Sequence, residues 1–179
     1  MKVLSNIKLF IFFTLILGIV YPISIFWIGN IAYPQKINGS LIKDKEKIIG
    51  SLLIGQDFTS EKFFQGRPSQ AKYDALASGG SNLSPISSSL KQRIEQDRIL
   101  GKKNEMLFMS ASGLDPHISE ESTLSQLDRI VNIRKLDLKS KERIVHFIEK
   151  MASEEEQSLF EIRKINVLKL NYFLEKEFN

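Results

Sequence analysis

The feature that most constrains this chain is an apolar stretch of 25 residues, Leu9 to Tyr33, which contains no charged residue. As a helix it would be roughly 37 Å long, at about 1.5 Å per residue, and the hydrocarbon core of a bilayer is roughly 30 Å thick. A single span can pair all of its backbone amides only as a helix. The stretch therefore predicts one transmembrane helix, in which Gly18 and Pro22 permit a kink.

A cleaved signal peptide is the main alternative to a retained anchor. Signal peptides have an apolar region of about 7–15 residues, followed by a small-x-small cleavage site. The stretch here is longer, and its closing residues 29–32 offer no good small-x-small pair. We therefore expect a retained anchor, and we rank a buried helix of a soluble core below both.

The charges that flank the anchor do not settle its orientation. Two lysines precede it, and four follow it closely: Lys36, Lys43, Lys45 and Lys47. The positive-inside rule would then favour a cytoplasmic C-terminal part, but long translocated domains largely ignore that rule. Flanking charge alone leaves the two orientations nearly equal.

Composition excludes several classes of function. The chain has no cysteine, so disulfides, thiolate catalysis and cysteine-ligated metals are absent. Its two histidines, His117 and His146, are far apart in sequence, and we expect no metal site. Beyond the anchor, 23 Lys and Arg residues alternate with 21 Asp and Glu residues instead of forming a basic stripe, which argues against nucleic-acid binding.

The remaining residues show the patterns of helices mixed with short strands. Apolar spacing and capping residues predict a helix over 86–100 and further helices after Ser119, from Ser140 and after Asn166. Short apolar runs predict strands, of which the first is buried, over 48–56, 106–109 and 160–165. The predicted fold is an α+β domain, with helices around a small sheet, behind a single N-terminal transmembrane α-helix.

The stretch 73–85 is the richest in glycine and serine, and consecutive backbone amides there could form an anion-holding nest. Because no lysine follows the glycines, it is not a P-loop, and an ordered structural loop is the favoured interpretation. The nucleotide or anion hypothesis has six residues, Ser78, Gly79, Gly80, Ser81, Asn82 and Gln56.

One further loop brings Ser112, Asp115 and His117 together in sequence, as a hydrolase triad might. Residues that are close within one loop seldom reach a common reaction centre, because catalytic triads draw on separated segments. We therefore expect no catalytic residue here. Arg67 precedes Pro68, so its backbone should be extended and its guanidinium is available to a carboxylate or phosphate.

Six segments, in this order and spacing, resemble the C subunit of the bacterial high-affinity potassium-transporting ATPase, the Kdp complex. They are NGSLI at 38–42, GSLLIGQ at 50–56, FFQGRPS at 63–69, YDALASGGSNLSP at 73–85, SGLDPHIS at 112–119 and RKINVLKLN at 163–171. The stretch 98–109 is less family-like. The resemblance covers nearly the whole chain.

The resemblance implies a non-catalytic accessory subunit, needed for assembly and proposed to act as a catalytic chaperone that raises the ATP affinity of its partner. The implied partners are an ATP-hydrolysing P-type subunit, a channel-like potassium-conducting subunit, a small membrane peptide and the lipid bilayer. ATP, Mg²⁺ and potassium would be handled by those partners, so this chain would hold no cofactor or metal.

The family's topology implies a short cytoplasmic N-terminus at 1–8, a transmembrane helix at 9–33 and an extracytoplasmic globular domain at 34–179 in the cell inner membrane. The expected partner contacts are Gly18, Ser24, Gly29, Arg67, Asp115 and His117, of which the first three allow close helix approach. A direct nucleotide-binding subunit with a cytoplasmic domain, and a membrane-tethered hydrolase, remain as alternatives.

Overall fold

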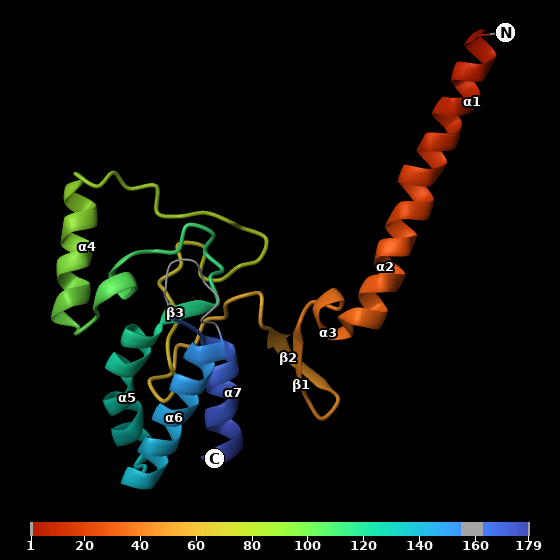
Figure 1. Cartoon of the computed structure of the whole chain (residues 1–179). Coiled ribbons are helices and arrows are strands. Elements are labelled where there is room, and N and C mark those ends of the chain that lie inside the picture. The colour runs from red at the N-terminus through yellow and green to blue at the C-terminus, as the bar shows by residue number, and fades with distance from the viewer. Residues whose placement is uncertain (1, 155–162, 179) are drawn as a thin grey trace. The chain divides into compact units, whose positions relative to one another are not determined.

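The structure, a computed structural model, describes residues 2–154 and 163–178. The chain divides into two compact units, Met1–Leu41 and Ile42–Asn179 (Figure 1). Unit 1 is helical, and unit 2 combines helices with two small sheets and long irregular segments. The predicted architecture, an apolar N-terminal helix followed by a mixed helix and small-sheet domain, is confirmed.

Unit 1 consists of α1 (Lys2–Leu15), a π-helical turn η1 (Ile16–Val20), α2 (Tyr21–Ala32) and the short α3 (Pro34–Ile37). The first three form one continuous helix, Val3–Ala32, which is long and apolar enough to cross a membrane. No residue in its most apolar part is buried in the structure. The helix starts earlier than predicted. It ends near the predicted position, because Pro34 disfavours a helical conformation at the residue before it.

The π-helical turn lies where the sequence predicts a kink. The Tyr21 N–H donates to the Ile16 carbonyl, five residues back, instead of four. Pro22 follows, and a proline ring inside a helix clashes with the carbonyl four residues earlier, here that of Gly18. Widening the turn over Ile16–Val20 relieves such a clash without breaking the helix.

Unit 2 is organised around three helices and one antiparallel strand pair. These are α5 (Glu120–Arg134), α6 (Leu138–Glu154) and α7 (Val167–Glu177), with β3 (His117–Ser119) paired to β4 (Lys164–Asn166). Strand residue Ile118 lies opposite Ile165, and both are buried. The core gathers apolar side chains from all five elements, from one loop and from a short 3-10 helix: Phe64, Met106, Ile118, Leu127, Ile130, Ile144, Ile148, Met151, Ile165, Val167, Leu170 and Leu174.

The helix starts follow the predicted capping chemistry. The Ser119 hydroxyl accepts from the Ser122 N–H and begins α5, and the Asn166 side chain accepts from the Lys169 N–H and begins α7. The α6 helix begins at Leu138 instead of Ser140, because Asp137 supplies the acceptor for the Ser140 N–H. These local bonds position β3 and β4 directly at the starts of the helices that follow them.

Two predicted strands are wrong or incomplete. The run 48–56 does not form one buried strand: β2 (Lys47–Ser51) pairs with β1 (Leu41–Asp44) as a hairpin, and Ile48 is 53% exposed. The run 106–109 lies in and beyond a 3-10 helix, η2 (Asn104–Leu107), whose curvature buries Met106 and Leu107 together. Only part of the predicted strand 160–165 lies among the described residues, where β4 occupies 164–166.

Long stretches of unit 2 have neither helix nor strand. They are residues 52–87 and 108–116, which we call the irregular segments. Between them lies α4 (Ser88–Ile99; Figure 1). It begins after the Ser87 cap, two residues later than predicted, and buries only Asp97. The irregular segments contain most of the family-like motifs, so they are where the candidate site is sought.

Candidate functional site

The two irregular segments are joined by hydrogen bonds at the motifs FFQGRPS and SGLDPHIS. The Ser110 N–H donates to the Pro68 carbonyl (2.9 Å), and the Ser69 hydroxyl donates to the Gly113 carbonyl (2.7 Å). Gly113 has a φ of +73°, a left-handed conformation that favours glycine. The two motifs, more than 40 residues apart in sequence, therefore form one structural unit.

Arg67 and Asp115 form the ion pair at the centre of this unit. The guanidinium Nη1 lies 3.2 Å from Asp115 Oδ2, and Nη2 lies 3.4 Å from the Met109 carbonyl oxygen. The two side chains are 26% and 30% exposed, so the pair is shielded from solvent on most sides. The structure thus gives Arg67 the carboxylate partner that its position before Pro68 suggested.

His117 borders the same ion pair. Its backbone N–H donates to Asp115 Oδ1 (3.0 Å), and its Nδ1 lies 3.9 Å from that oxygen, beyond hydrogen-bond distance. On its other side, Nε2 lies 3.5 Å from Asn166 Nδ2. Arg67, Asp115 and His117, three residues predicted to contact partners, therefore lie side by side.

These residues line an open cavity of about 310 Å³ together with Glu105, Ile118, Ser119 and Lys164. Arg67 also lines a neighbouring cavity of about 230 Å³, which includes Tyr73. With two cations, two carboxylates and one imidazole, the first cavity has no strong excess of one charge. Such a lining suits a polar contact with another protein surface better than selective binding of an anion.

Two titratable groups around the cavity have shifted pKa values. Burial, with smaller contributions from Asp57 and Asp115, raises the pKa of Tyr73 to about 12, and its hydroxyl donates to the Arg67 carbonyl (2.6 Å). The pKa of Glu105 is lowered overall. Burial raises it, but hydrogen bonds outweigh that effect, among them the one that the Ser119 N–H donates to Glu105 Oε1 (2.6 Å). At neutral pH Tyr73 is therefore neutral and holds the Arg67 carbonyl, and Glu105 is ionised and holds the Ser119 N–H.

A hydrolase triad is not assembled. Ser112 Oγ accepts from the Leu114 N–H (3.1 Å) and lies 3.2 Å from Ser110 Oγ, and it is absent from the cavity that Asp115 and His117 line. The Asp115 carboxylate, in turn, is engaged by Arg67 and by a backbone amide. The arrangement lacks the serine–imidazole–carboxylate relay that such catalysis needs.

The predicted anion loop, Ser78 to Asn82, packs against the other irregular segment. The Gly79 N–H and the Ser78 hydroxyl both donate to the Ser112 carbonyl, at 3.3 and 3.2 Å. Gln56 lies elsewhere: it donates to the Ile49 carbonyl (3.1 Å) and lines a cavity of about 460 Å³ beside α7. Two of the loop's donors are thus already used within the protein, and the nucleotide hypothesis stays an untested prediction.

The small residues of unit 1 differ in the space around them. A Cβ at Gly18 would have no atom within 4 Å, whereas one at Gly29 would lie 2.6 Å from Ile37 Cδ1. The Ser24 hydroxyl donates to the Val20 carbonyl (2.7 Å), so it is satisfied within the helix. Of the three predicted contact residues, Gly18 leaves the most room for a neighbouring helix.

Sequence reasoning missed the side chains that hold the first irregular segment in place. Asn171 of α7 accepts from the Phe64 N–H and donates to its carbonyl, both at 2.8 Å, and Gln126 of α5 does the same for Gln65 (2.8 and 3.1 Å). A buried asparagine in the apolar run of RKINVLKLN was the signal available, because a buried amide requires polar partners.

The described residues contain no group of three or more His, Asp or Glu side chains placed to hold a metal ion. Together, the fold and the site define a class: a small mixed domain that carries one helix able to span a membrane and presents a polar, ion-paired cavity built from loop motifs.

The particular family follows from comparison with known proteins. Residues 3–176 match the model of the KdpC family, described as "K+-transporting ATPase, c chain". The chain is 35% identical to a potassium-transporting ATPase KdpC subunit of Polynucleobacter asymbioticus, over 96% of both chains. It is 38% identical to that of Photorhabdus laumondii (96% of this chain, 94% of the relative) and 34% identical to that of Caldanaerobacter subterraneus (98% and 95%). The chain belongs to the KdpC family.

Proposed function

We propose that this chain is the non-catalytic accessory subunit of an ATP-driven, high-affinity potassium uptake complex, anchored in the cell inner membrane with its C-terminal domain outside the cytoplasm. The observation that carries the proposal is the helix Val3–Ala32, whose most apolar window is wholly unburied. Apolar surface of that extent requires lipid or other apolar helices around it. Together with membership of the KdpC family, this supports a membrane-embedded subunit.

The anchor is the proposed first contact with the other subunits. Helices associate in membranes through close packing at small residues. Gly18 is open on its side-chain face and lies in the π-helical turn, so a partner helix can approach the backbone there. Gly29 is covered by Ile37 of the same unit, which leaves Gly18 as the preferred contact.

The domain's proposed role is to stabilise the complex through the Arg67–Asp115–His117 cavity. Its partly exposed ion pair offers both a donor and an acceptor to a polar surface, whereas the engaged Ser112 supports the absence of catalysis. Across a bilayer from the site of ATP hydrolysis, the domain could raise ATP affinity only through a coupling free energy between distant sites. The family resemblance implies this chaperone role.

Co-purification tests the partners. We expect the full-length tagged chain, produced with the other subunits of its transporter and extracted in detergent, to bring down a P-type ATPase and a potassium-conducting subunit. Gly18→Ile should reduce the yield of the complex, because a branched side chain would hold the partner helix away. Ile19→Val, a change at the neighbouring exposed position, is the matched control. Recovery of the chain without companions would contradict the proposal.

The absence of cysteine makes the topology directly testable, since one introduced cysteine is the only thiol. We expect His146→Cys, at an exposed position of α6, to react with a maleimide that cannot cross the inner membrane. The reagent is added to cells whose outer envelope is permeabilised and whose inner membrane is intact. Asn6→Cys, before the apolar stretch, should react only after lysis. The reverse pattern would place the domain in the cytoplasm and favour the nucleotide-binding alternative.

A further inference from the structure

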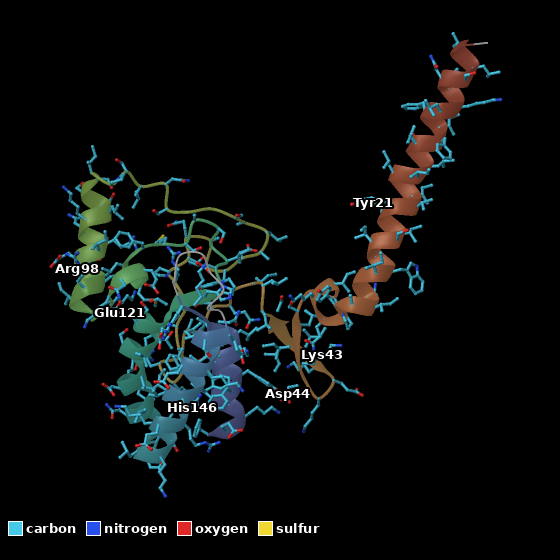
Figure 2. The ribbon with its side chains drawn as sticks, viewed as in Figure 1. Tyr21, Lys43, Asp44, Arg98, Glu121 and His146 are labelled. Atoms are coloured by element: carbon cyan, nitrogen blue, oxygen red, sulfur yellow. The ribbon has the colours of Figure 1, made fainter. Side chains whose placement is uncertain are left out.

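The β1–β2 hairpin of unit 2 carries three closely spaced lysines that form no ion pair with the rest of the described fold. Lys43, Lys45 and Lys47 are all exposed, and none of their ammonium groups forms an ion pair with a described residue. Asp44, which lies among them, is paired with Lys176 of α7. Figure 2 shows Lys43 and Asp44 on the hairpin. Glu46 is the remaining acid of the turn. We call residues 43–47 the basic hairpin.

The basic hairpin is covalently close to the anchor. Only eight residues, 33–40, separate the end of α2 at Ala32 from the start of β1 at Leu41. Fully extended, eight residues span at most about 28 Å, and the helical α3 within them shortens that reach. A domain of this size has a radius of gyration of about 14 Å. The link is therefore short enough for the basic hairpin to reach the membrane surface at which the anchor ends.

We propose that the basic hairpin binds the phosphates of anionic phospholipid headgroups at the membrane surface. Lysine ammonium groups are compact cations that pair well with phosphate, and each lysine near an anionic membrane strengthens binding by about fivefold. The attraction acts within a Debye length, about 8 Å at physiological salt, so it requires the short link described above. This inference rests on the proposed function only in needing the anchor to remain in the membrane.

The proposal also gives a role to three of the four lysines that follow the anchor, Lys43, Lys45 and Lys47. In the sequence they oppose the positive-inside rule, because they lie on the side that the family topology places outside the cytoplasm. Contact with lipid phosphates provides a reason for their presence there that does not involve translocation. An acidic surface of a partner subunit is the competing occupant, and the experiment below separates the two.

The test measures how near the hairpin lies to lipid headgroups. Ile48, which is 53% exposed and follows Lys47, is replaced by cysteine in the full-length chain and labelled with a fluorophore. The protein is placed alone in nanodiscs of phosphatidylcholine, or of equal parts phosphatidylcholine and phosphatidylglycerol, each containing headgroup-nitroxide lipid as a quencher. His146→Cys on α6 is labelled in parallel as the distant reference.

We expect stronger quenching at position 48 in the anionic discs than in the neutral ones, with a return to the neutral level at high salt. The triple variant Lys43→Gln, Lys45→Gln, Lys47→Gln should lose the difference, because removing three fivefold contributions weakens contact by about a hundredfold. A control triple variant removes the same charge from exposed positions on other elements: Lys91→Gln, Lys139→Gln and Lys150→Gln. It should retain the difference in quenching between anionic and neutral discs.

Several results would overturn the inference. Equal quenching in both lipids, or no effect of the hairpin triple, would show that the lysines do not hold anionic headgroups. Quenching that requires the other transporter subunits would assign the hairpin to a partner protein instead. Resistance of the chain to extraction by alkaline carbonate is measured on membranes of the cells that produce it. Release of the chain from those membranes would contradict the proposed function itself, whereas retention without quenching would contradict only this inference.

Discussion

The helices α5, α6 and α7 and the irregular segments of the same unit are held by different forces. The helices meet through buried apolar residues such as Ile144, Ile148 and Leu174, all 0% exposed. The irregular segments instead contribute few buried apolar residues, chiefly Phe64, and are fixed by side-chain amides, hydroxyls and guanidinium groups that bond to their backbone. Packing is tolerant of sequence, whereas each of these hydrogen bonds requires a particular donor or acceptor.

This difference explains why the family-like motifs lie mainly outside the helices. A loop without regular structure must satisfy its backbone groups one by one. Arg129 and Arg134 of α5 illustrate the solution, since their guanidinium groups donate to the carbonyls of Glu61, Phe63 and Lys62. Residues that are placed so specifically can then present a reproducible surface to a partner, as the Arg67–Asp115 pair does.

The largest effect is expected from the packed region. Ile148→Ala removes a fully buried side chain from α6 and should lower the free energy of unfolding by about 2–5 kcal/mol, through lost burial and a cavity. Thermal unfolding of the full-length chain in detergent, followed by circular dichroism, measures it, because the only tryptophan, Trp27, lies in the apolar helix. A loss of less than about 1 kcal/mol would show that the helices do not depend on this packing.

The second effect tests the polar clamp. Asn171→Ala leaves the buried N–H and C=O of Phe64 without partners, at about 1–3 kcal/mol each, so a loss of at least about 2 kcal/mol is expected. Hydrogen exchange should accelerate at residues 61–66 before the helices open. Gln126→Ala, which releases the partly exposed Gln65, is the matched control and should cost less, because water can replace its bonds. Equal effects would argue against burial as the cause.

A smaller effect is expected from a helix cap. Ser119→Ala removes the acceptor for the Ser122 N–H at the start of α5 and should cost about 1 kcal/mol of stability. Ser87→Ala removes the equivalent acceptor from α4, which buries only Asp97, so it should fray that helix without lowering the melting temperature of unit 2. A drop in melting temperature for both variants would mean that α4 folds together with the core.

The smallest effect is a dependence on pH at Glu105. Its pKa in the folded state is lowered, so the stabilisation it provides is present above its ordinary pKa of about 4.3 and is lost as the pH falls through the lower folded value. The difference in melting temperature between the wild type and Glu105→Gln should therefore shrink on acidification from pH 6 towards pH 3. A constant difference would show that the Ser119 N–H does not favour the ionised form.

The sequence by itself determined the apolar helix, the α+β class and most helix positions. Each of these follows from local physics: an uncharged run sets the span, and Ser119 and Asn166 cap the helices beside them. It also carried the family motifs in order. Strand assignments were weaker, because short apolar runs such as 106–109 fit a strand or a 3-10 turn equally well.

Only the tertiary structure decided how the loop motifs meet. Arg67 lies 48 residues from Asp115 in sequence, and Phe64 lies 107 residues from Asn171, so no local pattern pairs them. It also separated Gln56 from Ser78 and Ser112 from the cavity that His117 lines. The physical reason is that a hydrogen bond between distant residues depends on the path of the whole backbone between them, whereas caps, turns and an apolar span depend only on their neighbours.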